Sequence, residues 1–371
     1  MVENNGCGSQ NNVWVGSETG LLKSVNLCKK LATNHYDKDN YGKEHEIQRI
    51  CWEYEDRSVL YTAHKNGVVR KLETANGGYV DSFQIPEMEG KIAGLARLDS
   101  NFITCTSNGD LRLWSNENES LASSKAGDNV LCMDLNSELQ RVVTGGKENL
   151  VKLWDLNKPE QPIFKAKNVR PDWLEHRVPV WVTGLKFIPN SNKILSITGT
   201  HNIRVFDPKS NTRRPVLETS YEEYPLTAVD IVARNPNQVV VGNTHGDAAM
   251  FDIRKIKHVA RCYKGFAGSI REIRCHPSLP YFFSCSLDRH LRVHHERYPK
   301  VEHKVYLKSR LTCLLATDAE LEVKNDEKEP ETEKRKTEKD VWDELDDADS
   351  SESDSESDND LLPRKKKKQS S

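Results

Sequence analysis

The sequence contains no run of 18 or more apolar residues, although 36% of its 371 residues are hydrophobic. A membrane-spanning helix needs about 20 such residues in succession. The first twelve residues, MVENNGCGSQNN, have neither the basic region nor the apolar region of a secretory signal peptide. We therefore expect neither membrane insertion nor secretion.

No C-x-x-C spacing occurs among the nine cysteines, which are spread singly along the chain. Paired spacings are typical of zinc sites and redox motifs, and even counts are typical of disulfide frameworks. The pattern therefore predicts reduced, mostly buried thiols. The cysteines are Cys7, Cys28, Cys51, Cys105, Cys132, Cys262, Cys275, Cys285 and Cys313.

The chain also lacks H-E-x-x-H, G-x-G-x-x-G, G-x-x-x-x-G-K-[ST] and G-x-S-x-G, the motifs of common metal, nucleotide and nucleophile sites. The nearest approach to a metal cluster is His290, His294, His295 and His303. Adjacent residues of a strand point to opposite faces, so His294 and His295 do not share one ion. We expect no enzymatic activity, no cofactor and no metal.

What the sequence does contain is one pattern repeated seven times: a β-prone run, a short polar turn and a second, alternating run. The hairpins span residues 13–27, 59–74, 102–116, 142–156, 194–208, 239–253 and 281–295. Their last buried positions are expected at Val25, Leu72, Trp114, Trp154, Phe206, Phe251 and His294, spaced 40 to 52 residues apart. A period in the forties, with Trp-Asp or Phe-Asp ending a run, is the signature of WD-repeat propeller blades.

Further β-prone runs between the hairpins supply the remaining strands of four-stranded blades. The clearest cover residues 47–53, 92–98, 226–231 and 270–276. Turns at Asn66-Gly67 and Asn108-Gly109 supply the positive φ angle that tight hairpins need.

The two ends of the repeat region complete one another. The chain opens directly on a hairpin at Val13, and two β-prone runs, 304–307 and 311–316, follow the seventh hairpin. The first predicts the outer strand of blade seven and the second the inner strand of blade one, a closure that removes open sheet edges. We therefore predict an all-β fold, a seven-bladed WD40 β-propeller closed by a C-terminal strand, over residues 13–316. Residues 1–12 are expected to be disordered, and 317–371 to form a disordered charged tail.

Two long connections are the first candidates for partner binding, 166–181 and 213–226. Loops on a rigid scaffold that carry Trp, Tyr and Arg are typical contact sites. The candidates are Arg170, Asp172, Trp173, Arg177, Trp181, Arg213, Arg214, Tyr221 and Tyr224. Alternatively, Trp173 and Trp181 only cap the underside of the blades. A third polar stretch, 34–45, is expected to be a loop without such a role.

Charge is unevenly distributed inside the predicted propeller. Residues 254–310 contain 14 Lys or Arg and four acids, a field that favours RNA or an acidic partner. We add Arg271 and Arg274 of this sector to the candidate RNA-binding residues. The alternatives are an ordinary solvated rim and neutralisation by the protein's own acidic tail.

The tail explains why the net charge is only −2. From residue 318 onward it has 20 acidic and 11 basic residues, a balance of −9 that leaves +7 for the propeller. Four serines, each with an acid three positions on, are candidates for phosphorylation: Ser351, Ser353, Ser355 and Ser357. A basic run is a candidate nuclear or nucleolar localisation signal or a nucleic-acid patch: Arg364, Lys365, Lys366, Lys367 and Lys368. An apolar island at 341–345 is a weaker candidate for docking a partner.

Several segments belong to no general propeller consensus: 142–149, 166–181, 213–228, 239–246 and 302–309. With them the sequence resembles a family of nucleolar WD-repeat factors of large (60S) ribosomal subunit assembly that has a fungal counterpart. The resemblance implies a seven-bladed scaffold, monomeric within a larger assembly, that joins pre-60S particles and pre-rRNA. It also implies partnership with an AAA-type ATPase (nuclear valosin-containing protein-like) and with the RNA helicase of the exosome, in the nucleus and nucleolus.

Two other functions remain open at this point. The run Phe251-Asp252-Ile253-Arg254 looks like the aromatic-D-x-R motif with which some propellers dock a cullin-type ubiquitin ligase as substrate adaptors. As the end of a blade strand, the same run needs no such role. A histone-tail reader would need an acidic central channel, which the positive sector does not favour.

Overall fold

The computed structural model describes residues 11–35, 41–53, 57–86, 88–98, 100–171, 174–319 and 321. They belong to the first of two compact units, Met1–Glu322, whereas the second unit, Val323–Ser371, lies outside the described residues. The predictions for the tail beyond Leu321 and for Asp172 and Trp173 therefore also fall outside them. In the described part of the chain, no helix is both long and apolar enough to cross a bilayer.

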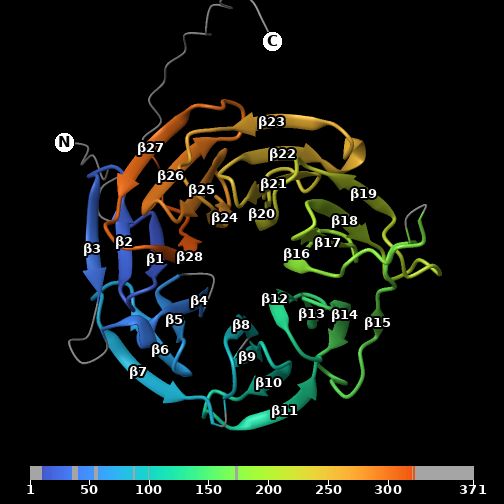
Figure 1. Ribbon diagram of the computed structural model, residues 1–371. Helices are drawn as coiled ribbons and strands as arrows, with labels where there is room; N and C mark the ends of the chain where they lie inside the picture. Colours follow the sequence, from blue (N-terminus) through green and yellow to red (C-terminus); the bar gives the residue numbers. More distant parts are fainter. Residues whose placement is uncertain are drawn as a thin grey trace, which may run out of the picture. The chain divides into compact units, whose positions relative to one another are not determined.

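Seven four-stranded antiparallel sheets stand as blades around a common centre (Figure 1), which confirms the predicted propeller. From inner to outer strand, blade 1 is β28 (Leu311–Ala316), β1 (Val13–Ser17), β2 (Leu22–Asn26) and β3 (Leu31–His35), and blade 2 is β4 (Ile47–Trp52), β5 (Val59–His64), β6 (Val68–Glu73) and β7 (Tyr79–Gln84). Blade 3 is β8 (Ile92–Leu98), β9 (Asn101–Thr106), β10 (Asp110–Trp114) and β11 (Ser120–Lys125), and blade 4 is β12 (Val130–Asn136), β13 (Arg141–Gly146), β14 (Asn149–Asp155) and β15 (Phe164–Lys165). Blade 5 is β16 (Val182–Phe187), β17 (Ile194–Thr198), β18 (Asn202–Phe206) and β19 (Leu217–Ser220). Blade 6 is β20 (Leu226–Ile231), β21 (Gln238–Asn243), β22 (Ala248–Asp252) and β23 (Val259–Tyr263), and blade 7 is β24 (Ile270–Cys275), β25 (Tyr281–Ser286), β26 (His290–His295) and β27 (Val301–Tyr306).

The ring closes between the two ends of the described chain. β28 pairs antiparallel with β1, from Val13 opposite Ala316 to Ser17 opposite Leu311. Just beyond this ladder, the backbone N–H of Thr317 donates to the carbonyl of Asn12 over 3.0 Å. The predicted closing strand is therefore confirmed, and blade 1 is built from the first three strands and the last strand of the described chain.

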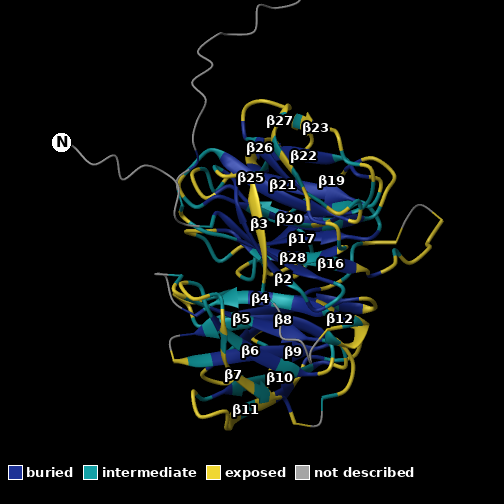
Figure 2. Cartoon of the chain, turned by 90° about the vertical axis from the view of Figure 1, so that its left-hand side faces the viewer, coloured by how far each residue is buried: buried dark blue, intermediate teal, exposed yellow. Residues whose placement is uncertain are grey.

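Two short 3-10 helices, η2 (Lys43–His45) and η3 (Ile253–Lys255), are the helical elements among the residues described. The stretch 34–45, expected as a loop, begins with the last two residues of β3 and ends with η2. β3 is an outer strand with four of its five residues exposed, visible in yellow in Figure 2. The second long connection also contains a strand, because β19 pairs with β18 and completes blade 5.

The repeated strand order sorts the connections onto two faces, because neighbouring strands of each blade run antiparallel. One side of the ring, which we call the turn face, carries the turns between the second and third strands of each blade. It also carries the connections from the outer strand of each blade to the inner strand of the next. Gly67 and Gly109 have φ angles of 84° and 82° in two of these turns, as predicted. The loop face is the opposite side of the ring.

Aromatic and aliphatic side chains from adjacent blades fill the spaces between the sheets. All seven positions expected to end a hairpin buried are at most 4% exposed: Val25, Leu72, Trp114, Trp154, Phe206, Phe251 and His294. Trp114 and Trp154 each donate the indole N–H to a threonine on the neighbouring strand of the same blade, Thr104 at 2.8 Å and Thr144 at 3.0 Å. A blade of four short strands thus becomes stable by packing on its neighbours.

Most of the cysteines belong to this core. Of the eight described, five are buried, two are half-buried and Cys262 is exposed, and none of the eight is in a disulfide. Burial raises the pKa values of Cys51, Cys105 and Cys313 to about 12. These thiols are therefore apolar filling at neutral pH, in agreement with the sequence analysis.

His294 replaces the aromatic residue of the repeat in blade 7. Its ring stacks between Phe266 and Phe282, with centroids 5.3 and 5.0 Å away, and the ring of Tyr263 meets it edge-on. Burial, and secondarily the nearby Arg292, lowers the pKa of His294 to about 4. The neutral ring thus serves as a core aromatic group.

A truncation tests the closure. A chain ending at Arg310 lacks β28, which exposes the edge of β1 and opens the ring. We expect it to lose the cooperative thermal transition and the near-ultraviolet circular dichroism of the full chain. A chain ending at Glu322 retains β28 and should keep both. A cooperative transition in the shorter chain would contradict a closure through β28.

The pH dependence of stability tests the role of His294. The unfolded chain protonates this ring near pH 6.5, whereas the folded chain does so only near pH 4, so its contribution is complete above about 6.5 and is lost as the pH falls toward 4. His294→Phe removes this titration. As the pH falls from about 6.5 to about 4, the free energy of unfolding in urea should decrease less steeply for His294→Phe than for the wild type. The difference in slope should be up to about 1.4 kcal/mol per pH unit. The exposed Leu121→Ala variant, which changes no titrating group, should keep the wild-type slope, and equal slopes for all three proteins would refute the assignment.

Candidate functional site

The connection from β15 to β16 places Trp181 on the turn face. Trp181 forms an isolated bridge with Lys147 of the β13–β14 turn, and its carbonyl accepts the N–H of Gly199 at 2.8 Å. The indole ring lies on Gly199, where a Cβ would overlap it, and the ammonium of Lys147 is 5.9 Å from the ring centroid. The side chain remains 36% exposed. Trp181 is thus positioned by two turns, with its ring partly open to solvent.

Arg177 lies on the same connection and is exposed. Its guanidinium donates to the carboxylate of Glu148 over 2.7 Å, and the N–H of Glu148 donates to the carbonyl of Val180 at 2.8 Å. A surface ion pair of this kind contributes little to stability, about 0 to 1 kcal/mol. The charge of Arg177 is therefore available to a partner at small energetic cost.

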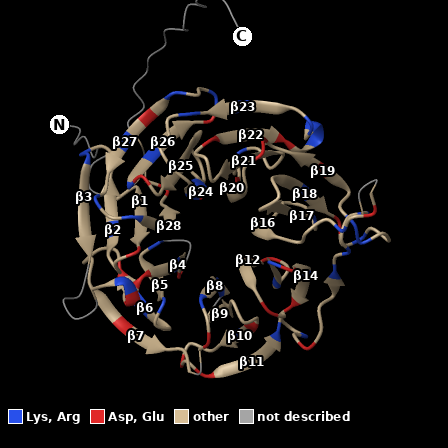
Figure 3. Cartoon of the chain, in the orientation of Figure 1, with Lys and Arg blue, Asp and Glu red and all other residues tan. Residues whose placement is uncertain are grey.

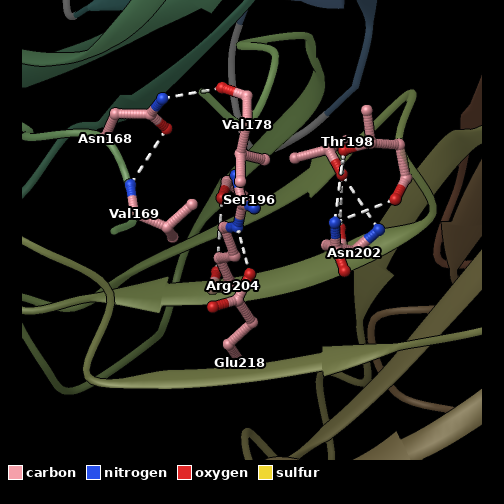
Figure 4. A network of polar contacts seen from close by, with 9 residues as sticks. Asn168, Val169, Val178, Ser196, Thr198, Asn202, Arg204 and Glu218 are labelled. Atoms are coloured by element: carbon pink, nitrogen blue, oxygen red, sulfur yellow. Dashed lines mark hydrogen bonds and ion pairs between the residues drawn. The ribbon is translucent and has the colours of Figure 1, made fainter. Parts of the chain in front are cut away.

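The beginning of this first connection, 166–181, is tied to its own end, as Figure 4 shows, and to the second connection, 213–226. The side chain of Asn168 donates to the carbonyl of Val178 at 2.7 Å and accepts the N–H of Val169 at 2.9 Å. The guanidinium of Arg214 donates to the carbonyl of Asn168 at 3.2 Å, and the carbonyl of Arg213 accepts the N–H of Lys167 at 2.8 Å. The structure thus brings Arg213 and Arg214 to the first loop, where Arg170 is exposed.

The two tyrosines of the second loop differ in role. Tyr221 is only 4% exposed and packs edge-on against Phe251, with centroids 5.5 Å apart, so it is a core residue and not the contact residue that the sequence suggested. Tyr224 is 43% exposed and stacks on His245 of the β21–β22 turn, at 4.5 Å and 12°. The ring of His245 is held in turn by Asp247 at 2.8 Å.

Exposed aromatic and basic groups therefore gather on the turn face of blades 4 to 6. We call this set the turn-face surface; it consists of Lys147, Arg177, Trp181, Tyr224 and His245. Rigid aromatic rings beside arginine are the residues that dominate protein interfaces. The sequence alone does not single out Lys147 and His245, because both lie in hairpin turns, where polar residues are common.

Arg271 and Arg274 lie elsewhere, on inner strand β24. Both line a central cavity of about 320 Å³ to which all seven inner strands contribute. The guanidinium of Arg274 pairs with Glu272 over 2.5 Å, and the other oxygen of Glu272 accepts the N–H of Leu314 on β28 at 2.9 Å. The structure therefore does not bring these arginines together with Arg213 and Arg214. Reversing the charge of Arg274 would disturb the ring closure as well as any binding.

Glu272 is one of three carboxylates that join inner strands of successive blades. Asp134 accepts the N–H of Phe187 at 2.8 Å, and Asp230 accepts that of Cys275 at 2.7 Å. The ammonium of Lys186 lies 3.1 Å from Asp230 and 3.8 Å from Asp134. For Asp134 and Asp230 the sequence signal is an acid inside a largely apolar inner strand, whereas Glu272 stands between Arg271 and Arg274.

Most basic side chains that line the cavity are paired with carboxylates or donate hydrogen bonds to backbone carbonyls. Arg49 donates to the carbonyls of Gln48, Ala93 and Leu131, so its guanidinium joins three inner strands. The lining has five basic side chains (Arg49, Arg97, Lys186, Arg271 and Arg274) and two acidic ones (Asp134 and Glu272). A basic lining does not offer the acidic channel that a histone-tail reader would need.

The remaining candidates have structural roles or lie outside the described residues. In the run 251–254, the carboxylate of Asp252 caps η3 by accepting the backbone N–H of Arg254, and it also accepts the guanidinium of Arg254. Both polar residues of the aromatic-D-x-R motif therefore have a structural role in this chain. Among the residues described, no three His, Cys, Asp or Glu side chains are grouped as metal ligands. Asp172, Trp173, the four candidate serines and the basic run 364–368 lie outside the described residues.

Comparison with known proteins links this geometry to a family. The model of the WD domain, G-beta repeat, matches residues 119–155 and 257–295. The chain is 45% identical over 312 residues to WD repeat-containing protein 74 of Bos taurus, covering 82% of this chain and 80% of that protein. It is 44% identical to the protein of that name from Homo sapiens, with the same coverage. It is also 27% identical over 208 residues to ribosome biogenesis protein NSA1 of Meyerozyma guilliermondii, covering 47% of this chain and 52% of that protein.

The carboxylate contacts of the inner strands generate a stability prediction. Asp230→Ala leaves the N–H of Cys275 without its acceptor and Lys186 with only the more distant Asp134. We expect the free energy of unfolding in urea to fall by about 3 kcal/mol. Asp81→Ala, on exposed β7, should change it by less than about 0.5 kcal/mol. A similar small change for both variants would show that the Asp230 contact does not hold the blades together.

Proposed function

The chain belongs to the WD repeat-containing protein 74 family, and from this we propose that it is a non-enzymatic scaffold of ribosome biogenesis that joins precursors of the large subunit. The name of its fungal relative, ribosome biogenesis protein NSA1, supports the process. A closed ring of small sheets supports the scaffold role, because it holds surface groups in fixed positions without itself changing shape.

The turn-face surface is the observation that carries the proposal. Trp181 and Tyr224 are large, partly exposed rings. The ring of Trp181 lies on Gly199, and the ring of Tyr224 stacks on His245. Because these rings are already immobilised, binding a partner costs little further side-chain entropy. Arg177 adds a charge whose present partner is an exposed carboxylate. Such a surface is suited to a protein or ribonucleoprotein partner.

Finer partners are proposed on the family resemblance. They are an AAA-type ATPase of the nuclear valosin-containing protein-like kind, which would release the scaffold, and the exosome-associated helicase, which would process the RNA. A nuclear and nucleolar location is proposed from the names of the relatives and from the basic run 364–368. Phosphorylation of the serines at 351–357 would add negative charge to the tail and weaken its attraction to RNA.

Sedimentation of nucleolar extracts tests the proposal. The triple variant Arg177→Glu, Trp181→Ala, Tyr224→Ala removes three contact groups of the turn-face surface without touching the core. We expect its share in pre-60S fractions to fall at least about tenfold, because hot-spot residues of this type each contribute about 2 kcal/mol. The thermal transition should be unchanged.

A matched control changes two exposed apolar residues and one charge elsewhere: Val80→Ala, Leu121→Ala and Lys158→Glu. It should co-sediment like the wild type. If the wild-type chain itself is absent from pre-60S fractions, the proposed function is wrong. If the wild type and both variants co-sediment equally, the particle is joined through another surface.

A further inference from the structure

Three arginines meet on the loop-face side of the junction between blades 6 and 7. Arg234 lies in the connection from β20 to β21, Arg261 on outer strand β23, and Arg297 in the connection from β26 to β27. All three interact electrostatically with the same two groups, His295 and Glu296. We call these three residues the arginine cluster. Lys and Arg residues stand at both ends of β23 in Figure 3.

The cluster is fixed by contacts between the two blades. The hydroxyl of Tyr263 on blade 6 donates to the carbonyl of Glu296 on blade 7 at 2.6 Å. The guanidinium of Arg261 donates to the same carbonyl at 3.2 Å. Arg261 is half-buried, whereas Arg234 and Arg297 are exposed. One arginine is thus anchored at the junction, and two reach into solvent beside it.

The charge of the cluster is poorly compensated. Two acids lie near it: Glu296, which interacts with all three arginines, and Glu302, which interacts with His295. Glu296 is only 8% exposed, and no donor in the described part of the chain reaches its Oε1 atom. Burial raises the pKa of Glu296, and this effect outweighs the three arginines, which lower it. Burial also lowers the pKa of His295, which keeps that ring neutral at pH 7. The site therefore has a surplus of positive charge that favours an anion.

An exposed aromatic ring lies next to the cluster. Tyr298 follows Arg297 directly, is 51% exposed and lies 4.9 Å from the ring of His295. Proteins that bind single-stranded nucleic acid combine arginines, which contact phosphates, with exposed rings, on which bases stack. An acidic peptide would use the charge but not the ring. The combination therefore favours RNA.

We propose that Arg234, Arg261, Arg297 and Tyr298 form a binding site for single-stranded RNA, in which the arginines hold backbone phosphates and Tyr298 stacks on a base. The proposal deepens the proposed function, on which it rests for the RNA being a ribosomal precursor. It also moves the RNA site away from Arg271 and Arg274, which face the central cavity, where Glu272 holds Arg274.

Fluorescence anisotropy with the purified full chain and a labelled single-stranded RNA of about 20 nucleotides tests the site. The variant Arg234→Glu/Arg297→Glu changes only exposed side chains and should bind at least about tenfold more weakly. The slope of log K against log salt should decrease in magnitude by about 1.4, or about 0.7 for each phosphate that the variant no longer neutralises. Tyr298→Ala should weaken binding several-fold without changing the slope, because it removes stacking and no charge.

The control Lys29→Glu/Lys30→Glu makes the same change in net charge on exposed residues of the β2–β3 turn, also on the loop face. It should stay within about threefold of wild type. If both double variants bind RNA equally weakly, the loss of affinity follows net charge alone and the proposed site is wrong. Wild-type binding by Arg234→Glu/Arg297→Glu would overturn it as well, as would a wild-type chain that binds a poly-glutamate peptide but not RNA.

The two proposals fail separately. If the wild-type chain binds RNA through the arginine cluster but is absent from pre-60S fractions, the site stands and the proposed function fails. If the chain co-sediments with those fractions while the cluster variant binds RNA normally, the RNA site fails alone.

Discussion

The pairing of β28 with β1 is the contact on which the rest of the molecule depends. No blade buries both of its faces alone, so each is stable only while two neighbours cover it, and one open junction exposes two blades at once. Asp134, Asp230 and Glu272 reinforce this closure from inside, because each carboxylate accepts a backbone N–H of the next inner strand. The last of these contacts reaches β28 itself and links the closing strand to blade 7 as well as to blade 1.

Closure also explains how surface groups become fixed in position. Trp181 rests on a turn of the following blade, Tyr224 stacks on a turn of the blade that it introduces, and Arg261 is held by a carbonyl of the next blade. All three depend on the placement of one element relative to its neighbour. The two surfaces differ in character: the turn-face surface combines exposed aromatic rings with Lys147 and Arg177, whereas the junction of blades 6 and 7 presents three arginines beside a buried carboxylate. Under the two proposals, the turn-face surface would take a protein and the arginine cluster an RNA on the opposite face.

The fold could be predicted from the sequence because the repeats carry clear signals: a period in the forties and glycines in the turns. In addition, the extra strand after blade 7 matches the inner strand that is missing before Val13. The site could be predicted only in part. The pattern showed that 166–181 and 213–226 were longer than a blade needs, but it did not show that β19 lies within the second or that Tyr221 packs on Phe251. Arg271 and Arg274 stood out by composition, yet strand β24 directs them to the cavity. The arginine cluster joins residues from three elements, a proximity that no local pattern contains.

The central claim is that the ring is a scaffold on precursors of the large ribosomal subunit. Ultraviolet cross-linking of the full chain in nucleolar extract, followed by sequencing of the attached RNA, tests it most directly. The account predicts reads concentrated in a few segments of the large-subunit precursor RNA and reduced by Arg234→Glu/Arg297→Glu. Reads spread over cellular RNA in proportion to abundance, or no RNA above a mock purification, would contradict it.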